Sequence, residues 1–252
     1  VDDGSSDGTT EIISKKFPDV EIIKGNGNLF WVGGMVFGLK HSTKLKRFDY
    51  LLAYNDDIHL YPNALQHLIN TSNEYTNEKG VKEHIVVGSF KDSYNQNTTY
   101  GGLIRSSWWH PLRFVRLDPP KKKYVFVDTL NMNACLISCS TIKKIGFLNK
   151  EFVHTSADID YGLSLNKNGG KVILCSNYLG TCSRNLNQDN YLENSKNLFE
   201  AYKKSIDIKK SPLKSRFILL KNHGGFFYPI FFIMSFLYLP FSYILKKYFK
   251  KS

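Results

Sequence analysis

Aspartate side chains stand at three points of the chain where they can meet a charged ligand. Asp2 and Asp3 open a turn, Asp56 and Asp57 follow an apolar run and Asn55, and Asp158 opens a helical stretch. Carboxylates hold divalent cations through hard oxygen ligands, and they also act as general bases. Adjacent carboxylates repel one another unless a cation relieves them, so a merely solvated turn is the weaker interpretation of Asp56 and Asp57.

A loop rich in glycine and asparagine lies between the first two acidic positions, with the sequence Gly-Asn-Gly-Asn-Leu-Phe-Trp-Val-Gly-Gly-Met over residues 25–35. Glycines such as Gly33 let a ligand approach the backbone closely, and the amide of Asn28 offers both donors and acceptors. Trp31 either covers a nucleotide or sugar or packs in the core. The composition of this loop favours contact with a polar ligand.

Strands and helices alternate along the chain, which predicts an α/β domain with a mainly parallel sheet. Ligands of such sheets bind beyond the carboxyl ends of the strands, where both acidic pairs fall. Residues 91–123 read as loop. Helices are expected over 9–17, 31–40, from Pro62, near Ile142 and over 158–168; strands are expected over 20–24, 50–54, 84–90, 124–127, 133–138 and 171–175.

The chain opens at Val1 directly into a turn. A lone valine in front of such a turn is typical of the last residue of a strand. We therefore expect the first strand of the sheet to be missing from this sequence.

The positive charge is concentrated in the last 50 residues. The whole chain carries a formal charge of +12, but residues 203–252 hold 11 Lys or Arg against one acid, which leaves residues 1–202 nearly neutral. The basicity therefore argues against a nucleic-acid-binding body.

An uncharged stretch of 24 residues, Asn222 to Leu245, lies between lysines in this segment. Its length suits a bilayer core, while Pro229 and Pro240 favour an in-plane or re-entrant arrangement equally well. A buried core helix is the remaining alternative. We predict a catalytic domain over 1–202 and a basic linker with a membrane-anchoring helical tail over 203–252.

The four cysteines (Cys135, Cys139, Cys175 and Cys182) show no spacing typical of a structural zinc site. Two of them stand inside apolar runs, where a free thiol behaves as a small hydrophobe. The pattern indicates a reducing environment.

Four stretches together resemble the family 2 glycosyltransferases, of the rhamnosyltransferase-like, cell-surface polysaccharide type. Val-Asp-Asp-Gly-Ser-Ser-Asp-Gly-Thr over 1–9 is similar to the first donor-site signature, and the 25–35 loop to the second. Asn-Asp-Asp over 55–57 is similar to the DxD-type metal motif, and Asp-Ile-Asp-Tyr-Gly over 158–162 to the region of the catalytic base. The resemblance covers roughly residues 1–185 and implies a GT-A, Rossmann-like nucleotide-sugar-binding domain.

The resemblance also implies roles for individual residues. Asp3 would accept a hydrogen bond from the nucleotide base, unless this stretch is only a turn. Asp57 would bind Mg²⁺ or Mn²⁺, and Asp56 would face the ribose or share the cation. Asp158 would be the base, a role compatible with capping its helix. Asn28, Trp31 and Gly33 would contact the donor.

Two departures from the family pattern affect the charged groups. Asn55 stands where an acid is common, so a grip on the metal by two carboxylates is in question. Ser164 stands where many relatives have an arginine, whose phosphate contact would be absent or supplied by Arg184.

These observations predict an inverting, metal-dependent transfer of a sugar from a nucleoside diphosphate donor. The acceptor would be a membrane-linked or cell-surface glycan, and the enzyme would sit at the cytoplasmic face of a membrane without a nucleic-acid partner. The alternative is a non-catalytic glycan-assembly protein that keeps the fold.

Overall fold

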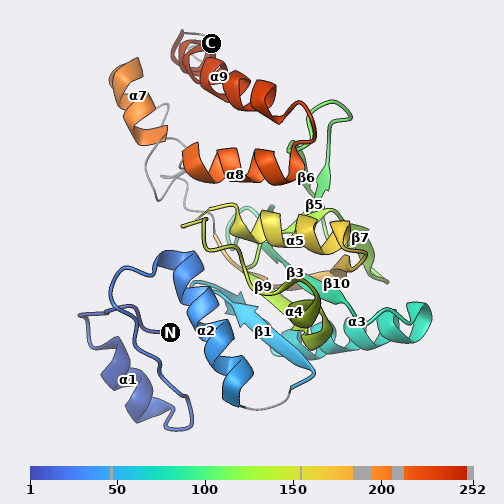
Figure 1. Ribbon diagram of the computed structural model, residues 1–252. Coiled ribbons are helices and arrows are strands. Elements are labelled where there is room, and N and C mark those ends of the chain that lie inside the picture. The colour runs from blue at the N-terminus through green and yellow to red at the C-terminus, as the bar shows by residue number, and fades with distance from the viewer. Residues whose placement is uncertain (46–47, 154, 184–194, 206–212, 249–252) are drawn as a thin grey trace.

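The computed structural model describes residues 1–45, 48–153, 155–183, 195–205 and 213–248. A mixed sheet with helices on both faces forms the body, and α7, α8 and α9 lie together on one side of it, beyond α5 (Figure 1). The helices are α1 (Thr9–Lys16), α2 (Phe30–Leu45), α3 (Ala64–Lys79), α4 (Cys139–Ile145), α5 (Ala157–Lys167), α7 (Leu198–Ser205), α8 (Leu213–His223) and α9 (Tyr228–Tyr248).

The main sheet has the strand order β1-β9-β3-β10-β2, with β4 paired to β3 and β7 to β10. A second sheet has the order β6-β5-β8. The strands are β1 (Tyr50–Tyr54), β2 (His59–Leu60), β3 (His84–Lys91), β4 (Thr98–Tyr100), β5 (Gly102–Arg105), β6 (Phe114–Arg116), β7 (Val125–Val127), β8 (Thr129–Leu130), β9 (Ala134–Ser138) and β10 (Lys171–Thr181).

Alternate residues of the central strands face two separate cores. Ile85 and Val87 of β3 pack into the core that also holds the buried side of α2, α4 and α5. Val86 and Leu136 face the other way, onto Leu68 of α3. Because both faces are covered, β3 is buried at every residue but the last and β9 is buried throughout.

The prediction of a mainly parallel sheet is wrong for the described strands. Only β3 and β10 pair in parallel, whereas β9 runs antiparallel to both of its neighbours, β1 and β3. A strand buried on both faces is continuously apolar in either direction, so the apolar run of β9 concealed its orientation.

Two stretches differ from the elements predicted for them. Residues 20–24 form only one parallel bridge, between Asp2 and Lys24, instead of a strand. Residues 91–123, predicted as loop, contain β4, β5 and β6. These strands have three or four residues each, too few to show a period.

Helix α8, inside the predicted tail, packs against the body. Its Ile218 and Leu219 are buried in the same core as α2 and α5. Among the residues that the structure describes, no helix combines the length and the apolar character that crossing a bilayer requires.

Candidate active site

Asp2 closes the first turn. Its carboxylate accepts hydrogen bonds from the hydroxyl of Thr10 and from the backbone N–H of Ser5, the latter at 2.9 Å. These bonds, Thr10 first, lower the pKa of Asp2 to about 2. Its backbone also pairs with Ile23 and Gly25. Asp2 is thus a charged residue that shapes the turn.

Asp3 binds the loop over residues 25–35, the second donor loop of the family resemblance. One of its carboxylate oxygens accepts the backbone N–H of Gly27 at 2.8 Å, and the other accepts that of Leu29 at 2.7 Å. Gly25 is required for this approach, because a Cβ there would collide with the Asp3 carboxylate. The structure therefore uses Asp3 to join the first two motifs, and its contact with a nucleotide base stays a prediction.

The second donor loop also contacts the other two motifs. The indole N–H of Trp31 donates to the side-chain oxygen of Asn55 at 3.1 Å. The backbone N–H of Val32 donates to the carbonyl of Val153, just before α5, at 3.2 Å. One short segment thus binds the first turn, the Asn-Asp-Asp motif and the approach to Asp158. Asn55, a departure from the family pattern, has a structural task here.

Asn28 and Gly33 lie in this same segment. Asn28 is exposed, with its backbone N–H on the side chain of Asn26. Gly33 belongs to the first turn of α2, because its N–H donates to the Leu29 carbonyl. Both lie close in sequence to Gly27 and Leu29, whose backbone N–H groups bind Asp3. Their contacts with a donor stay predictions.

Two residues of this region have strained backbone. Phe30, the first residue of α2, has φ 53°, and Ser156, in front of α5, has φ 70°. Positive φ is uncommon for residues with a side chain and costs about 1–3 kcal/mol. Both residues flank the bond between Val32 and Val153, so the surrounding contacts impose this conformation where the motifs meet.

Asp56 and Asp57 form an exposed turn after β1. The described residues contain no cluster of three or more His, Cys, Asp or Glu arranged to bind a metal. Two exposed carboxylates fit a hard cation that takes its other oxygen ligands from a diphosphate. Burial, and after it the negative charge of Asp57, raise the pKa of Cys182 to about 11. Asp57 therefore lies near Cys182, which directly follows β10.

Asp158 lies in the first turn of α5, whose N-cap is Ser156. Burial raises the pKa of its carboxyl, and hydrogen bonds from the backbone of Ile159, the side chain of Asn131 and the backbone of Met132 oppose that shift. A carboxylate held partly desolvated binds a proton more readily than an exposed aspartate does.

Residues 131–133 connect Asp158 to the acidic turn, and the sequence analysis missed them. Asn131 bonds to Asp158, while the carbonyl of Asn133 accepts the N–H of Asn55 at 2.9 Å. The side-chain oxygen of Asn131 is buried without a hydrogen-bond partner among the described residues. Two asparagines directly before a buried apolar strand were the available signal.

Asp160 performs a different task from Asp158. Its carboxylate accepts a hydrogen bond from Asn222 at 3.0 Å and contacts the imidazole of His223 at 2.9 Å. Asp160 and His223 are both buried. Asp160 therefore attaches α8 to α5.

Helix α5 can hold these carboxylates in place because it lies close to β8. A Cβ at Gly162 would overlap the side chains of Thr129 and Leu130. Ser164 follows on the same helix, and Arg184, the alternative phosphate ligand, lies outside the described residues.

Comparison with known families gives a match. The family model described as Glycosyl transferase family 2 matches residues 1–144, more than half of the chain. The matched range contains the first turn, the second donor loop and the Asn-Asp-Asp motif, whereas Asp158 lies beyond it. A comparison with curated proteins gave no match.

Proposed function

This chain belongs to glycosyltransferase family 2, and we propose on that premise that it transfers a sugar from a nucleoside diphosphate to a glycan, with inversion at the anomeric carbon. One observation carries the proposal: the segment from Gly27 to Val32 bonds to Asp3, to Asn55 and to Val153, which lies five residues before Asp158. The structure thus brings together residues more than 100 positions apart in sequence, which supports the proposal of one shared site.

Asp158 is the proposed base. As the acceptor oxygen attacks the anomeric carbon, its proton passes to the Asp158 carboxylate, and the bond to the diphosphate breaks on the opposite side. The raised pKa of Asp158 supports this role, because a more basic carboxylate removes the proton more effectively. Asn131 positions the carboxylate by its hydrogen bond.

Asp57, with Asp56, is the proposed metal ligand. Bound Mg²⁺ or Mn²⁺ would neutralise the charge that develops on the leaving diphosphate. Asn55 fixes the start of this turn through its bonds with Trp31 and Asn133. The family's use of nucleotide sugars supports the donor, while the nucleotide and the sugar are open.

A membrane-linked or cell-surface glycan is the proposed acceptor, at the cytoplasmic face of a membrane. Four large apolar side chains of α9 are more than 40% exposed and recur at helical spacing: Ile230, Ile233, Met234 and Leu237. Such a stripe suits a helix that lies in the interfacial plane of a bilayer. In this proposal the tail 203–252 joins the catalytic domain 1–202 to the membrane through α8 and α9.

Nucleotide binding tests the proposal. Nucleoside diphosphates should raise the melting temperature of the full chain in the presence of Mn²⁺, because a ligand of the native state stabilises it by mass action. Asp57→Asn should abolish the Mn²⁺-dependent part of this shift. Asp19→Asn, the same change at an exposed site elsewhere, should leave it intact.

Two results would contradict the assignment. An Mn²⁺-dependent shift that survives in Asp57→Asn removes Asp57 from the metal site. Nucleotide binding without any release of nucleoside diphosphate from nucleotide sugars supports the non-catalytic glycan-assembly protein.

A further inference from the structure

Two adjoining cavities lie between α5, α8 and the start of α9. The first, about 450 Å³, has a polar lining that includes Arg105, Asp128 and His223. The second, about 700 Å³, is lined mainly by apolar side chains, among them Phe226, Phe227 and Ile230. They share Lys167, Asn222 and Gly225, so they form one groove that is polar at one end and apolar at the other.

The polar end carries a net positive charge. Arg105 is partly neutralised by Asp128, at 3.8 Å. Lys167 and Lys221 are exposed, and neither has an ion-pair partner among the described residues. His223 is already engaged with Asp160. Lys167, which lines both cavities, and Lys221, which lines the apolar one, therefore remain for an anion.

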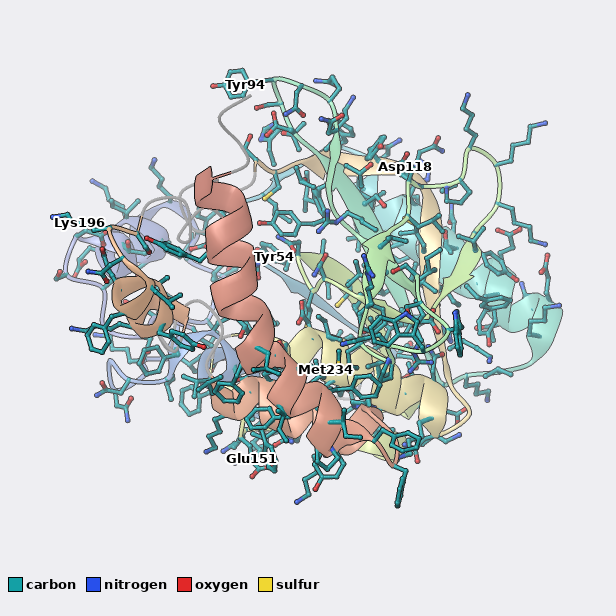
Figure 2. The ribbon with its side chains drawn as sticks, turned by 90° about the horizontal axis from the view of Figure 1, so that it is seen from above. Tyr54, Tyr94, Asp118, Glu151, Lys196 and Met234 are labelled. Atoms are coloured by element: carbon teal, nitrogen blue, oxygen red, sulfur yellow. The ribbon has the colours of Figure 1, made fainter. Side chains whose placement is uncertain are left out.

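The apolar end is open to solvent. Phe226 is 90% exposed, Phe227 58% and Ile230 52%. The stripe continues along α9 through Ile233 and Met234; Figure 2 shows α9 nearest the viewer, with Met234 on it. Aromatic and aliphatic side chains in such a row favour an apolar partner over water.

We propose that this groove binds the phosphate headgroup of a membrane lipid, with Lys167 and Lys221 on the phosphate and Phe226, Phe227 and Ile230 along the chain. The proposal deepens the membrane contact of the proposed function. A free phosphate would leave the apolar end exposed, and an uncharged lipid would leave the lysines unpaired.

The position of the groove connects it to the active site. Asn222 and His223, which both line it, bond to Asp160, two residues from Asp158 on α5. A lipid in this groove therefore lies on the helix that carries the proposed base.

Vesicle flotation of the full chain tests the proposal. The protein should bind phosphatidylcholine vesicles containing phosphatidate more strongly than vesicles of phosphatidylcholine alone. Lys167→Gln/Lys221→Gln should weaken phosphatidate binding by roughly 30-fold, the effect of two lysines near an anionic surface. Lys79→Gln, an exposed lysine at the end of α3, is the matched control and should change it little.

A second variant tests the apolar end. Phe226→Ser/Phe227→Ser removes two exposed rings, so the fold should survive, as an unchanged melting temperature would show. It should weaken binding to both kinds of vesicle while leaving nucleotide binding intact. Failure of lipid binding with intact nucleotide binding thus refutes this proposal alone.

Three outcomes would overturn the proposed groove. Equal binding to both kinds of vesicle would leave the lysines without a headgroup role. An equal loss in Lys79→Gln would indicate general charge attraction. Complete competition by inorganic phosphate, with no requirement for the two phenylalanines, would indicate a site for free phosphate.

Discussion

Replacing Asp160 with alanine tests how α8 is held to the catalytic body. The Asp160 carboxylate meets Asn222 at 3.0 Å and His223 at 2.9 Å, and the Asp160 and His223 side chains are 8% and 5% exposed. Alanine would leave the buried imidazole of His223 without this acceptor, whereas the exposed Asn222 can bond to water instead. An unsatisfied buried donor costs about 1–3 kcal/mol. We expect the free energy of unfolding to fall by about 2 kcal/mol, which lowers the melting temperature by roughly 4–8 °C in a chain of this size.

Thermal and urea unfolding measure this effect. Asp160→Asn keeps one acceptor oxygen and should lose less than the alanine variant. Glu151→Ala, at an exposed position, should stay within about 0.5 kcal/mol of the wild type. Nucleotide affinity should be unchanged in all three. If Asp160→Ala melts within about 2 °C of the wild type, the contact does not hold α8, and the reasoning fails.

Three further predictions concern the site and the tail. Trp31→Phe removes the bond to Asn55 and should weaken Mn²⁺-dependent nucleotide binding by roughly 3–10-fold in a titration; unchanged affinity would show that this bond does not position the acidic turn. Because the pKa of Asp158 is raised and the base must be unprotonated, release of nucleoside diphosphate should decline about tenfold per pH unit below a midpoint that lies above the usual range of an aspartate. A midpoint in the ordinary range would contradict its burial. A chain ending at Gly225 should fold and bind nucleotide without binding vesicles, whereas one ending before Leu213 should lose stability in a melting experiment, because it lacks all of α8.

The elements of the body were predictable because their signals are local. The apolar run Tyr50–Tyr54 predicted β1 with its bounds, and the amphipathic stretch after Pro62 predicted α3. The direction of β9 was not predictable, because a strand that is buried on both faces has the same apolar pattern whether it runs parallel or antiparallel to its neighbours. The short strands between residues 91 and 123 are defined by partners distant in sequence.

The candidate site shows the same division. An acid after an apolar run predicted that Asp57 stands beyond the end of β1, and an acid before a helical stretch predicted that Asp158 stands near the start of α5. The bonds of Asp3 to Gly27 and Leu29 join residues more than 20 positions apart, and no local pattern predicts them. The same holds for Asn131 beside Asp158.

Burial of Asp158 has opposite consequences for stability and for chemistry. Its folded-state pKa lies above the unfolded value, so its contribution to stability is present at low pH and is lost as the pH rises through the folded pKa. At neutral pH the charged carboxylate therefore destabilises the fold. Asparagine carries no charge, so Asp158→Asn should be at least as stable as the wild type.

The most direct test of the central claim is the rate of nucleoside diphosphate release by wild type and Asp158→Asn, with the nucleotide sugar that most stabilises the wild type. If Asp158 is the base of one shared site, the rate should fall by about 10²–10⁴-fold, the usual effect of positioned proton transfer. The dissociation constant of the nucleotide should stay within about twofold, and the melting temperature should not fall. A rate within a few-fold of the wild type would contradict the account, because the base would then lie elsewhere.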